Sequence, residues 1–141
     1  MSQTNELEIM ERIALDLEGV EESLASSFNT GAEDFNALIR PLSAAGGKRL
    51  RAQLCLLIAN AGTSVERQRI RIAEAVEMLH LATLIHDDVL DQAEIRRGEE
   101  TIHMHKGNKV AILSGDYLFA KAFHIVSEMP NMKYLQIFSH I

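Results

Sequence analysis

The sequence predicts an all-α protein, a single helical bundle over residues 1–141. Ala, Leu, Ile, Glu and Met are plentiful, and these residues favour helix over strand. Apolar residues recur at spacings of three and four along nearly the whole chain, which is the period of an amphipathic helix. Proline occurs only at positions 41 and 130, and hydrophobic residues make up 47% of the chain, so long helices and a packed core are both expected.

The first part of the chain predicts three helices. The first covers residues 5–27, with an apolar face formed by Ile9, Ile13, Leu17, Val20 and Leu24. A second lies near residues 32–43, where Pro41 is expected to bend the helix or end it early. The Gly46-Gly47 turn then leads into a third, apolar helix that ends near Asn60.

The second part of the chain predicts a long helix, a loop and two further helices. The long helix covers about residues 65–91, and Thr63 followed by Glu66 has the spacing of a capping box at its start. Arg96-Arg97-Gly98 predicts a loop, and another helix covers about residues 108–127. The helical pattern from residue 132 reaches the last residue without a stop signal, so we expect the chain to be part of a longer protein.

Charge and cysteine content argue against several classes of function. The formal net charge is −6, which disfavours non-specific binding to nucleic acid or anionic membranes. Cys55 is the single cysteine and lies in an apolar run, which predicts a buried structural thiol rather than a disulfide or zinc ligand. No apolar run approaches the ~20 residues of a membrane span, and no signal segment opens the chain, so we expect a cytoplasmic protein.

The chemistry is concentrated in the motif His86-Asp87-Asp88-Val89-Leu90-Asp91. At ~100° per residue, Asp87 and Asp91 lie about 40° apart on a helix, and His80 falls on the same face. Clustered carboxylates repel one another and attract a cation, and their oxygens suit Mg²⁺, which shares the rest of its shell with phosphates. Asp87 and Asp91, with Asp88 to one side, are therefore candidate Mg²⁺ ligands.

Two other interpretations of the aspartates remain open. They could form a solvated acidic helix end, or ion pairs with Arg96 and Arg97. A zinc site that combines them with His80 and His86 is the weaker alternative, because the spacing is not an established zinc-ligand pattern.

Two basic clusters accompany the aspartates. Lys48, Arg49 and Arg51 follow the Gly46-Gly47 turn, and Arg96-Arg97 follows the aspartate motif. Arginine can make two parallel hydrogen bonds to phosphate oxygens, and a glycine turn allows close approach to the backbone. Either cluster alone is more often a solvated surface. Together with the carboxylates they predict a site for two anions, one bound through a metal ion and one bound directly.

A series of motifs follows in order between residues 46 and 123. They are Gly46-Gly47-Lys48-Arg49-Leu50-Arg51, Glu77-Met78-Leu79-His80, the aspartate motif, Arg96-Arg97-Gly98, Gly107-Asn108-Lys109 and Gly115-Asp116-Tyr117. In order and spacing they resemble the trans-polyprenyl diphosphate synthase family. Ala52 and Glu100 stand where that family commonly has Pro, and Lys106 stands where an aromatic residue is usual, but none of these differences removes a ligand.

The resemblance implies the N-terminal half of an isoprenoid-synthase-type fold and a prenyltransferase that condenses isopentenyl diphosphate with an allylic diphosphate. It implies that Asp87 and Asp91, supported by Asp88, bind Mg²⁺ that grips the allylic diphosphate. Arg96 would contact the same diphosphate and assist catalysis with Asp87 and Asp91. The diphosphate of isopentenyl diphosphate would be held by Lys48, Arg51, His80 and Arg97, with Arg49 nearby.

Members of this family are longer and carry a second aspartate-rich motif, whereas this sequence has no other Asp-Asp pair. We therefore expect a fragment of a longer enzyme, or one subunit of a split enzyme completed by a second chain. A homo-oligomer in which two copies face each other is a further possibility. The alternative function is a non-catalytic regulatory or binding subunit of a heteromeric prenyl diphosphate synthase, and a plain helical adaptor is a distant third.

The resemblance also bears on product length. In the family, the residue five positions before the first aspartate often forms the floor of the product tunnel, and here it is Ala82, followed by Thr83. A small floor leaves room for a growing chain, so the resemblance predicts a medium-to-long product. The alternative is that Ala82 serves ordinary helix packing.

Overall fold

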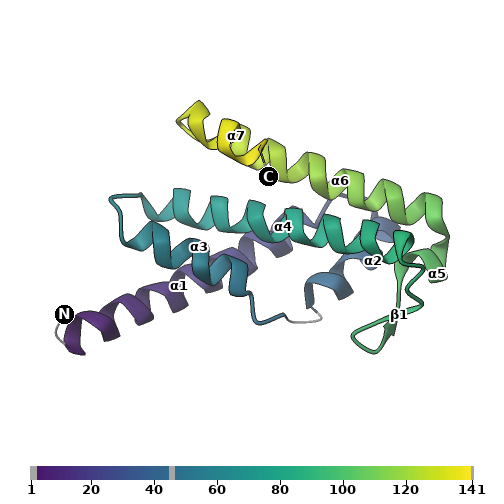
Figure 1. Cartoon of the computed structure of the whole chain (residues 1–141), viewed down its shortest axis with the longest axis horizontal. Coiled ribbons are helices and arrows are strands. Elements are labelled where there is room, and N and C mark those ends of the chain that lie inside the picture. Colours follow the sequence, from purple (N-terminus) through teal and green to yellow (C-terminus); the bar gives the residue numbers. More distant parts are fainter. Residues whose placement is uncertain (1–2, 45–46, 141) are drawn as a thin grey trace.

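The computed structural model describes residues 3–44 and 47–140, so Gly46 of the predicted turn lies outside the described residues. Within them the protein is helical apart from one short hairpin (Figure 1), which confirms the all-α prediction. The helices are α1 (Gln3–Ser27), α2 (Glu33–Ala44), α3 (Leu50–Asn60), α4 (Glu66–Leu90), α5 (Ile102–Lys106), α6 (Asn108–Ser127) and α7 (Met132–Phe138). The antiparallel hairpin strands are β1 (Ile95–Arg96) and β2 (Glu99–Glu100).

The long helix α4 runs through the middle of the bundle and packs against α1, α3 and α6 (Figure 1). Ala73, Ala75 and Ala82 are fully buried on α4, and such small side chains let neighbouring helices approach closely. A close contact lies at Gly115 of α6, where an added Cβ would lie 2.3 Å from Nε2 of His86. A larger residue at position 115 would therefore require the His86 ring to move.

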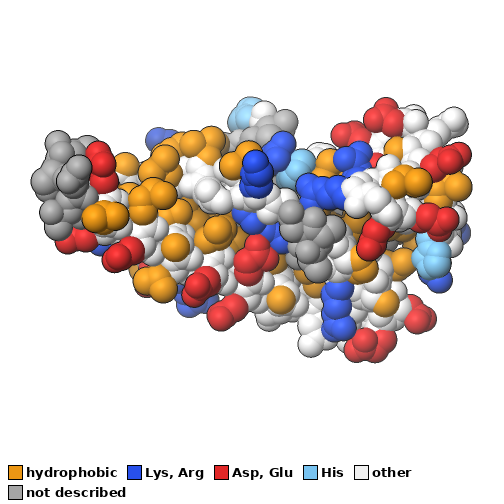
Figure 2. Space-filling view, turned by 90° about the horizontal axis from the view of Figure 1, so that it is seen from below, with side chains coloured by type: hydrophobic (Ala, Val, Ile, Leu, Met, Phe, Trp, Pro, Cys, Tyr) orange, Lys and Arg blue, Asp and Glu red, His pale blue; other side chains and the backbone are white. Residues whose placement is uncertain are grey.

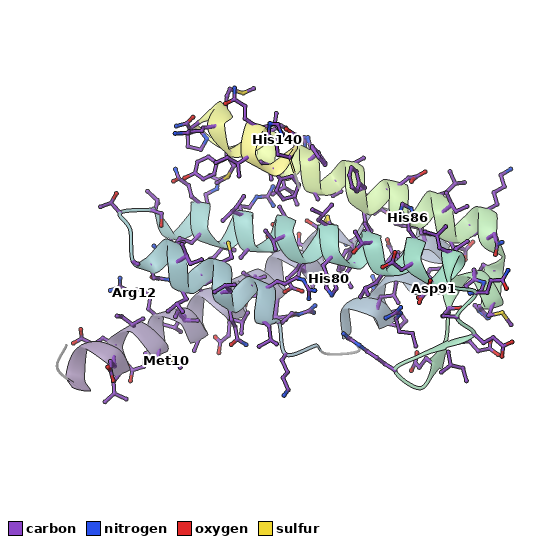
Figure 3. The ribbon with its side chains drawn as sticks, in the orientation of Figure 1. Met10, Arg12, His80, His86, Asp91 and His140 are labelled. Atoms are coloured by element: carbon purple, nitrogen blue, oxygen red, sulfur yellow. The ribbon has the colours of Figure 1, made fainter. Side chains whose placement is uncertain are left out.

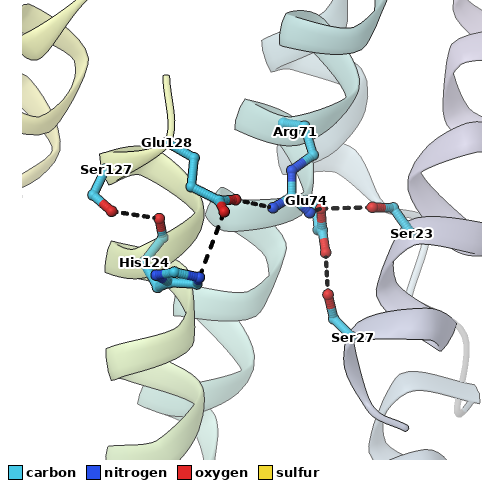
Figure 4. A network of polar contacts seen from close by, with 7 residues as sticks. All are labelled: Ser23, Ser27, Arg71, Glu74, His124, Ser127 and Glu128. Atoms are coloured by element: carbon cyan, nitrogen blue, oxygen red, sulfur yellow. Dashed lines mark hydrogen bonds and ion pairs between the residues drawn. The ribbon is translucent and has the colours of Figure 1, made fainter. Parts of the chain in front are cut away.

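A buried polar network joins α4 to α1 and α6 (Figure 4). Glu74 is fully buried and accepts hydrogen bonds from the hydroxyls of Ser23 and Ser27, both at 2.6 Å, and from Nη1 of Arg71 at 2.7 Å. Nη2 of Arg71 also donates to Glu128, just beyond the end of α6, at 2.8 Å. Each buried oxygen of Glu74 thus has a donor, which offsets the cost of burying the charge.

A second buried ion pair holds α1 against the start of α4. Nε and Nη2 of Arg69 donate to the carboxylate of Asp16 at 2.8 and 3.2 Å, and Nδ2 of Asn60 donates to it at 3.0 Å. Burial alone would raise the pKa of Asp16, but the hydrogen bonds from Arg69 and Asn60 hold it below its usual value. Asp16 therefore stays charged, and three helices meet at one carboxylate.

The structure differs from the sequence-based expectations at two helix boundaries. Helix α2 continues past Pro41 to residue 44, and both Pro41 and Ala37, whose carbonyl lacks its helical donor, are exposed and can be solvated. The predicted capping box is wrong, because Val65 occupies the N-cap position of α4 and no side chain caps it. Ser64 instead donates its hydroxyl to the carbonyl of Ala59 at 2.7 Å.

Two remaining expectations concern burial. Cys55 is half-buried and not fully buried as predicted; it packs against the core, and burial raises the pKa of its thiol. The expectation that no segment approaches the length of a membrane span is corrected by helix α6, which is long and apolar enough by length and composition alone. The core helix of a bundle passes the same test, and α6 has Leu118, Ala122 and Ile125 fully buried.

Candidate functional site

Two of the three predicted metal ligands share an exposed face at the end of α4. Asp87 and Asp91 are both exposed, and the backbone N–H of Asp91 donates to the carbonyl of Asp87 at 2.8 Å. Figure 3 shows Asp91 at the end of α4 and His80 further back along the helix. The carbonyl end of a helix carries negative partial charge, which adds to the attraction of two carboxylates for a cation. These oxygens fit a hard cation that takes further ligands from a phosphate.

Asp88 does not belong to this exposed face, and its assignment as a supporting metal ligand stays a prediction. Its side chain is only 5% exposed, and Oδ1 accepts a hydrogen bond from Nε of Arg96 at 2.6 Å. The ion-pair interpretation is therefore right for Asp88 and Arg96. Among the described residues, no group of three or more His, Cys, Asp and Glu side chains is placed to hold a metal ion.

His80 and Arg51 meet across the α3–α4 interface. Nη1 of Arg51 lies 3.1 Å from Nε2 of His80, and since Arg51 can only donate, Nε2 is the acceptor and Nδ1 carries the proton. Burial lowers the pKa of His80, and so do the charges of Arg51, Arg97 and Arg96, while Glu77 opposes them. Three arginines from two separate segments are thus close enough to His80 to act on it.

The hairpin carries Arg97 back to the loop before α3. Arg97 and Gly98 form the turn between β1 and β2, and their φ angles of +53° and +86° are both positive, as in a type I′ turn. An added Cβ at Gly47 would lie 3.3 Å from Nη2 of Arg97, so a larger residue there would crowd the guanidinium. Lys48 follows Gly47 and is exposed. The two basic clusters are therefore adjacent in space.

Arg49 lies in a different place from the other basic residues of its cluster. It is only 8% exposed, and its Nε and Nη2 donate to the carboxylate of Glu21 at 2.5 and 3.1 Å. Its Nη1 lies 3.7 Å from Glu77. Arg49 uses its charge inside the bundle to hold the segment before α3, and its contact with a substrate stays a prediction.

A cavity that the sequence did not predict lies beside Asp88. Its volume is about 730 Å³, and α2, α4, the hairpin and α5 surround it. Most of its lining is apolar, including Leu38, Leu42, Leu81, Leu84, Ile85 and Ile102. Charged residues also line the cavity, namely Asp34, Asp88, Arg96, Arg97, Glu99, Glu100 and Lys106. It is therefore a largely apolar space with charged groups of both signs in its wall.

The two residues predicted to control product length face different surroundings. Ala82 is fully buried and is not part of the cavity wall, which agrees with ordinary helix packing. Thr83 is exposed, lies one turn before Asp87, and donates its hydroxyl to the carbonyl of His80 at 2.8 Å. Thr83 is thus the member of the pair that shares the face of the aspartates.

Known proteins are similar to this chain over most of its length. The sequence profile of the polyprenyl synthetase family matches residues 32–141. Solanesyl diphosphate synthase 1 of Arabidopsis thaliana is 34% identical over 94% of this chain and 34% of its own length. Heptaprenyl diphosphate synthase component 2 of Geobacillus stearothermophilus is 38% identical over 86% of this chain and 38% of its own length.

Solved structures agree with the sequence comparisons. The polyprenyl synthase of Caulobacter crescentus, complexed with calcium and isoprenyl diphosphate, superposes with a TM-score of 0.85 at 36% identity. The match covers 92% of this chain and 41% of the other. The predicted fold is thereby confirmed, and the chain spans about a third to two fifths of the length of these relatives.

Proposed function

We propose that this chain, which belongs to the polyprenyl synthetase family, supplies the first aspartate motif and the adjoining basic residues of a trans-prenyltransferase site. The supporting observation is the arrangement of charges along one side of α4. Asp87 and Asp91 are exposed at its end, and His80 lies further back, hydrogen-bonded to Arg51 and within the influence of Arg97. Carboxylates and arginines in this order suit two diphosphates, one of them bound through a metal ion.

The proposed reaction condenses isopentenyl diphosphate with an allylic diphosphate. The allylic C–O bond breaks and its electron pair leaves with the diphosphate; the double bond of isopentenyl diphosphate attacks the allylic carbon, and loss of one proton restores a double bond. Mg²⁺ held by Asp87 and Asp91 would offset the charge that develops on the leaving diphosphate. Arg96 would add a positive charge beside the same group while Asp88 fixes its direction.

The second diphosphate would be held by Lys48, Arg51, His80 and Arg97. Neutral His80 accepts from Arg51 through Nε2, which fixes the direction of that guanidinium before a ligand arrives. Lys48 follows Gly47 in the chain, and the absence of a side chain at Gly47 lets the guanidinium of Arg97 lie close to the backbone beside it. The names of the two relatives, a solanesyl and a heptaprenyl diphosphate synthase, support a medium-to-long product.

A completing partner is the second part of the proposal. Helix α3 exposes Leu50, Leu54, Leu57 and Ile58 along its outer side, at the spacing of one helix face. Figure 2 shows hydrophobic side chains along this face of the molecule, beside Lys and Arg side chains gathered around a histidine. An apolar stripe next to a charged site suits a further set of helices that carries the second aspartate motif. The name of the component 2 relative supports a multi-chain enzyme.

The test is a Mg²⁺-dependent condensation assay with radiolabelled isopentenyl diphosphate. We expect little or no product from the 141-residue chain alone, and prenyl diphosphate products when a chain with the second aspartate motif is added. Robust turnover by a partner-free sample would contradict the need for that motif in a second chain and would favour a homo-oligomer. A stable complex without product would favour the regulatory-subunit alternative.

A further inference from the structure

Glu77 is a buried carboxylate near the site that the proposed mechanism does not use. It is only 4% exposed, and it lies on α4 one turn before His80. Its Oε1 accepts a hydrogen bond from the backbone N–H of Ala52 at 3.0 Å, and its Oε2 lies 3.7 Å from Nη1 of Arg49. Both contacts are made to the segment that carries Lys48 and Arg51.

The contact with Ala52 compensates for a missing helix cap. The first N–H groups of a helix have no partner within the helix, and an N-cap side chain normally accepts from the second or third of them. At the start of α3 the N-cap residue is Arg49, and its side chain makes no capping bond. Ala52 is the third residue of α3, so Glu77 caps this helix from α4, with its negative charge at the positive end of the helix.

The contact with Arg49 fixes an uncommon backbone conformation. Arg49 has a φ of +47°, in the left-handed region that residues other than glycine seldom adopt. Such conformations persist where surrounding contacts enforce them, and they gather at functional sites. Here Glu21 of α1 and Glu77 of α4 both hold the Arg49 guanidinium. Two helices therefore determine how the chain enters α3.

We propose that Glu77 is a positioning residue for diphosphate binding, which rests on the proposed function. Arg51 lies between the two points that Glu77 holds, Arg49 and Ala52, and its own guanidinium meets His80, one turn beyond Glu77 on α4. One stretch of α4 thus contacts the backbone of residues 48–52, which we call the basic loop, and also carries His80, the side chain that Arg51 contacts. The anion meets arginines whose directions are already set, so less ordering is needed on binding.

The experiment is calorimetric titration of the 141-residue chain with isopentenyl diphosphate in the absence of Mg²⁺. Glu77→Ala should weaken binding about tenfold, because the segment that carries Lys48 and Arg51 would then have to be ordered when the anion binds. Glu77→Gln should recover part of the affinity, because its amide oxygen can still accept from Ala52. Glu74→Ala is the matched control, since Glu74 is buried on the same helix but contacts Ser23 and Ser27 and not the basic loop.

Amide hydrogen exchange supplies a second measurement that does not depend on ligand binding. The N–H of Ala52 should exchange faster in Glu77→Ala and stay protected in Glu77→Gln and Glu74→Ala. Unchanged affinity in Glu77→Ala, with a parent chain that binds and an Arg51→Ala variant that binds weakly, would overturn this inference and leave the proposed function standing. An equal loss in Glu74→Ala would also overturn it, because general destabilisation would then explain both. A parent chain without measurable binding would contradict the proposed function itself.

Discussion

The protonation state of His80 depends on the groups that surround it. Its Nε2 accepts from Arg51, and burial together with neighbouring arginines lowers its pKa, so the folded chain holds a neutral imidazole at pH 7. As the pH falls below about 6.5, the ordinary pKa of histidine, the unfolded chain binds a proton at His80 while the folded chain still holds the neutral ring. Stability therefore falls as the pH drops through the window between the two pKa values.

The first prediction concerns the titration of His80. Isopentenyl diphosphate should raise the pKa of His80, because a bound anion favours the imidazolium form. Arg51→Gln should also raise it in the ligand-free chain by removing the nearest positive charge. Both shifts are measurable from the imidazole signals in a two-dimensional NMR titration. A pKa that stays constant on addition of the diphosphate would place the ligand elsewhere.

The second prediction concerns the two exposed aspartates. Asp87→Ala or Asp91→Ala should weaken Mg²⁺-dependent binding of an allylic diphosphate about tenfold or more, because the metal ion loses one of two hard ligands. Calorimetry with and without Mg²⁺ separates this loss from direct diphosphate binding. Glu94→Ala is the control, an exposed acidic residue just beyond α4. Equal affinities in all three variants would remove the metal assignment.

At the scale of single elements, a substitution on the buried face of α4 tests packing, whereas one on the exposed face tests the site. The family resemblance points to Ala82 as the tunnel floor, but Ala82 is fully buried, whereas Thr83 lies on the exposed side with Asp87. We therefore predict that Ala82→Phe destabilises the fold by about 1–3 kcal/mol through overpacking, and that Thr83→Phe does not. Urea denaturation monitored by circular dichroism gives both values.

Product length should follow the same distinction. In the completed enzyme, Thr83→Phe should shift the products to shorter chains, because an aromatic side chain would fill space beside the aspartates. Thr83→Ser is the matched control and should leave the product profile as it is. Chromatography of radiolabelled products distinguishes the two, and an unchanged profile in Thr83→Phe would show that this face does not line the product channel.

The elements also show how far the sequence could predict the structure. The period of apolar residues is enough to place α1, α4 and α6, because each is long and has one buried face. The two-residue strands and the five-residue α5 are too short to give a periodic signal. The hairpin nevertheless determines much of the site, since it brings Arg96 to Asp88 and Arg97 to Gly47.

The surroundings of several site residues are decided by tertiary contacts that the sequence does not show. Asp88 and Asp87 are adjacent and chemically alike, and only the position of Arg96 shows which one is buried. Arg49 resembles its neighbours in the basic cluster, but Glu21, 28 positions earlier, pairs with it. Glu77 belongs to the motif Glu77-Met78-Leu79-His80, but the sequence assigns it no role, because the backbone N–H that it accepts from lies on another helix. Contacts between residues so far apart in the sequence cannot be predicted from the spacing of neighbouring residues.

At the scale of the whole molecule, the chain leaves apolar surface uncovered beside its charged site. Leu54 is 58% exposed and Ile58 is 66% exposed on the outer side of α3. We predict that the isolated chain self-associates through this stripe, and that Leu54→Glu weakens self-association about tenfold or more by placing a charge in the contact. Analytical ultracentrifugation over a range of concentrations measures it.

The matched control for the α3 stripe is Leu7→Glu, at a comparably exposed leucine on α1. It should leave self-association unchanged, and both variants should keep the helical signal of the parent. If the two substitutions act equally, the association is a non-specific response to exposed apolar surface. The same Leu54→Glu variant should also fail to capture the completing partner.

The contact between His86 and Gly115 connects the aspartate motif on α4 to the facing helix α6. His86 immediately precedes Asp87, and its Nε2 lies against α6, 3.2 Å from the carbonyl oxygen of Ile112 and 3.2 Å from Oδ1 of Asp116. An added Cβ at Gly115 would lie 2.3 Å from the same nitrogen. A larger residue at position 115 would take the space of this ring, so the side chain next to Asp87 would have to move away from α6. A graft of the aspartate motif into another helical scaffold should therefore include a glycine on the facing helix, because the histidine ring next to the first aspartate needs the space that this glycine leaves.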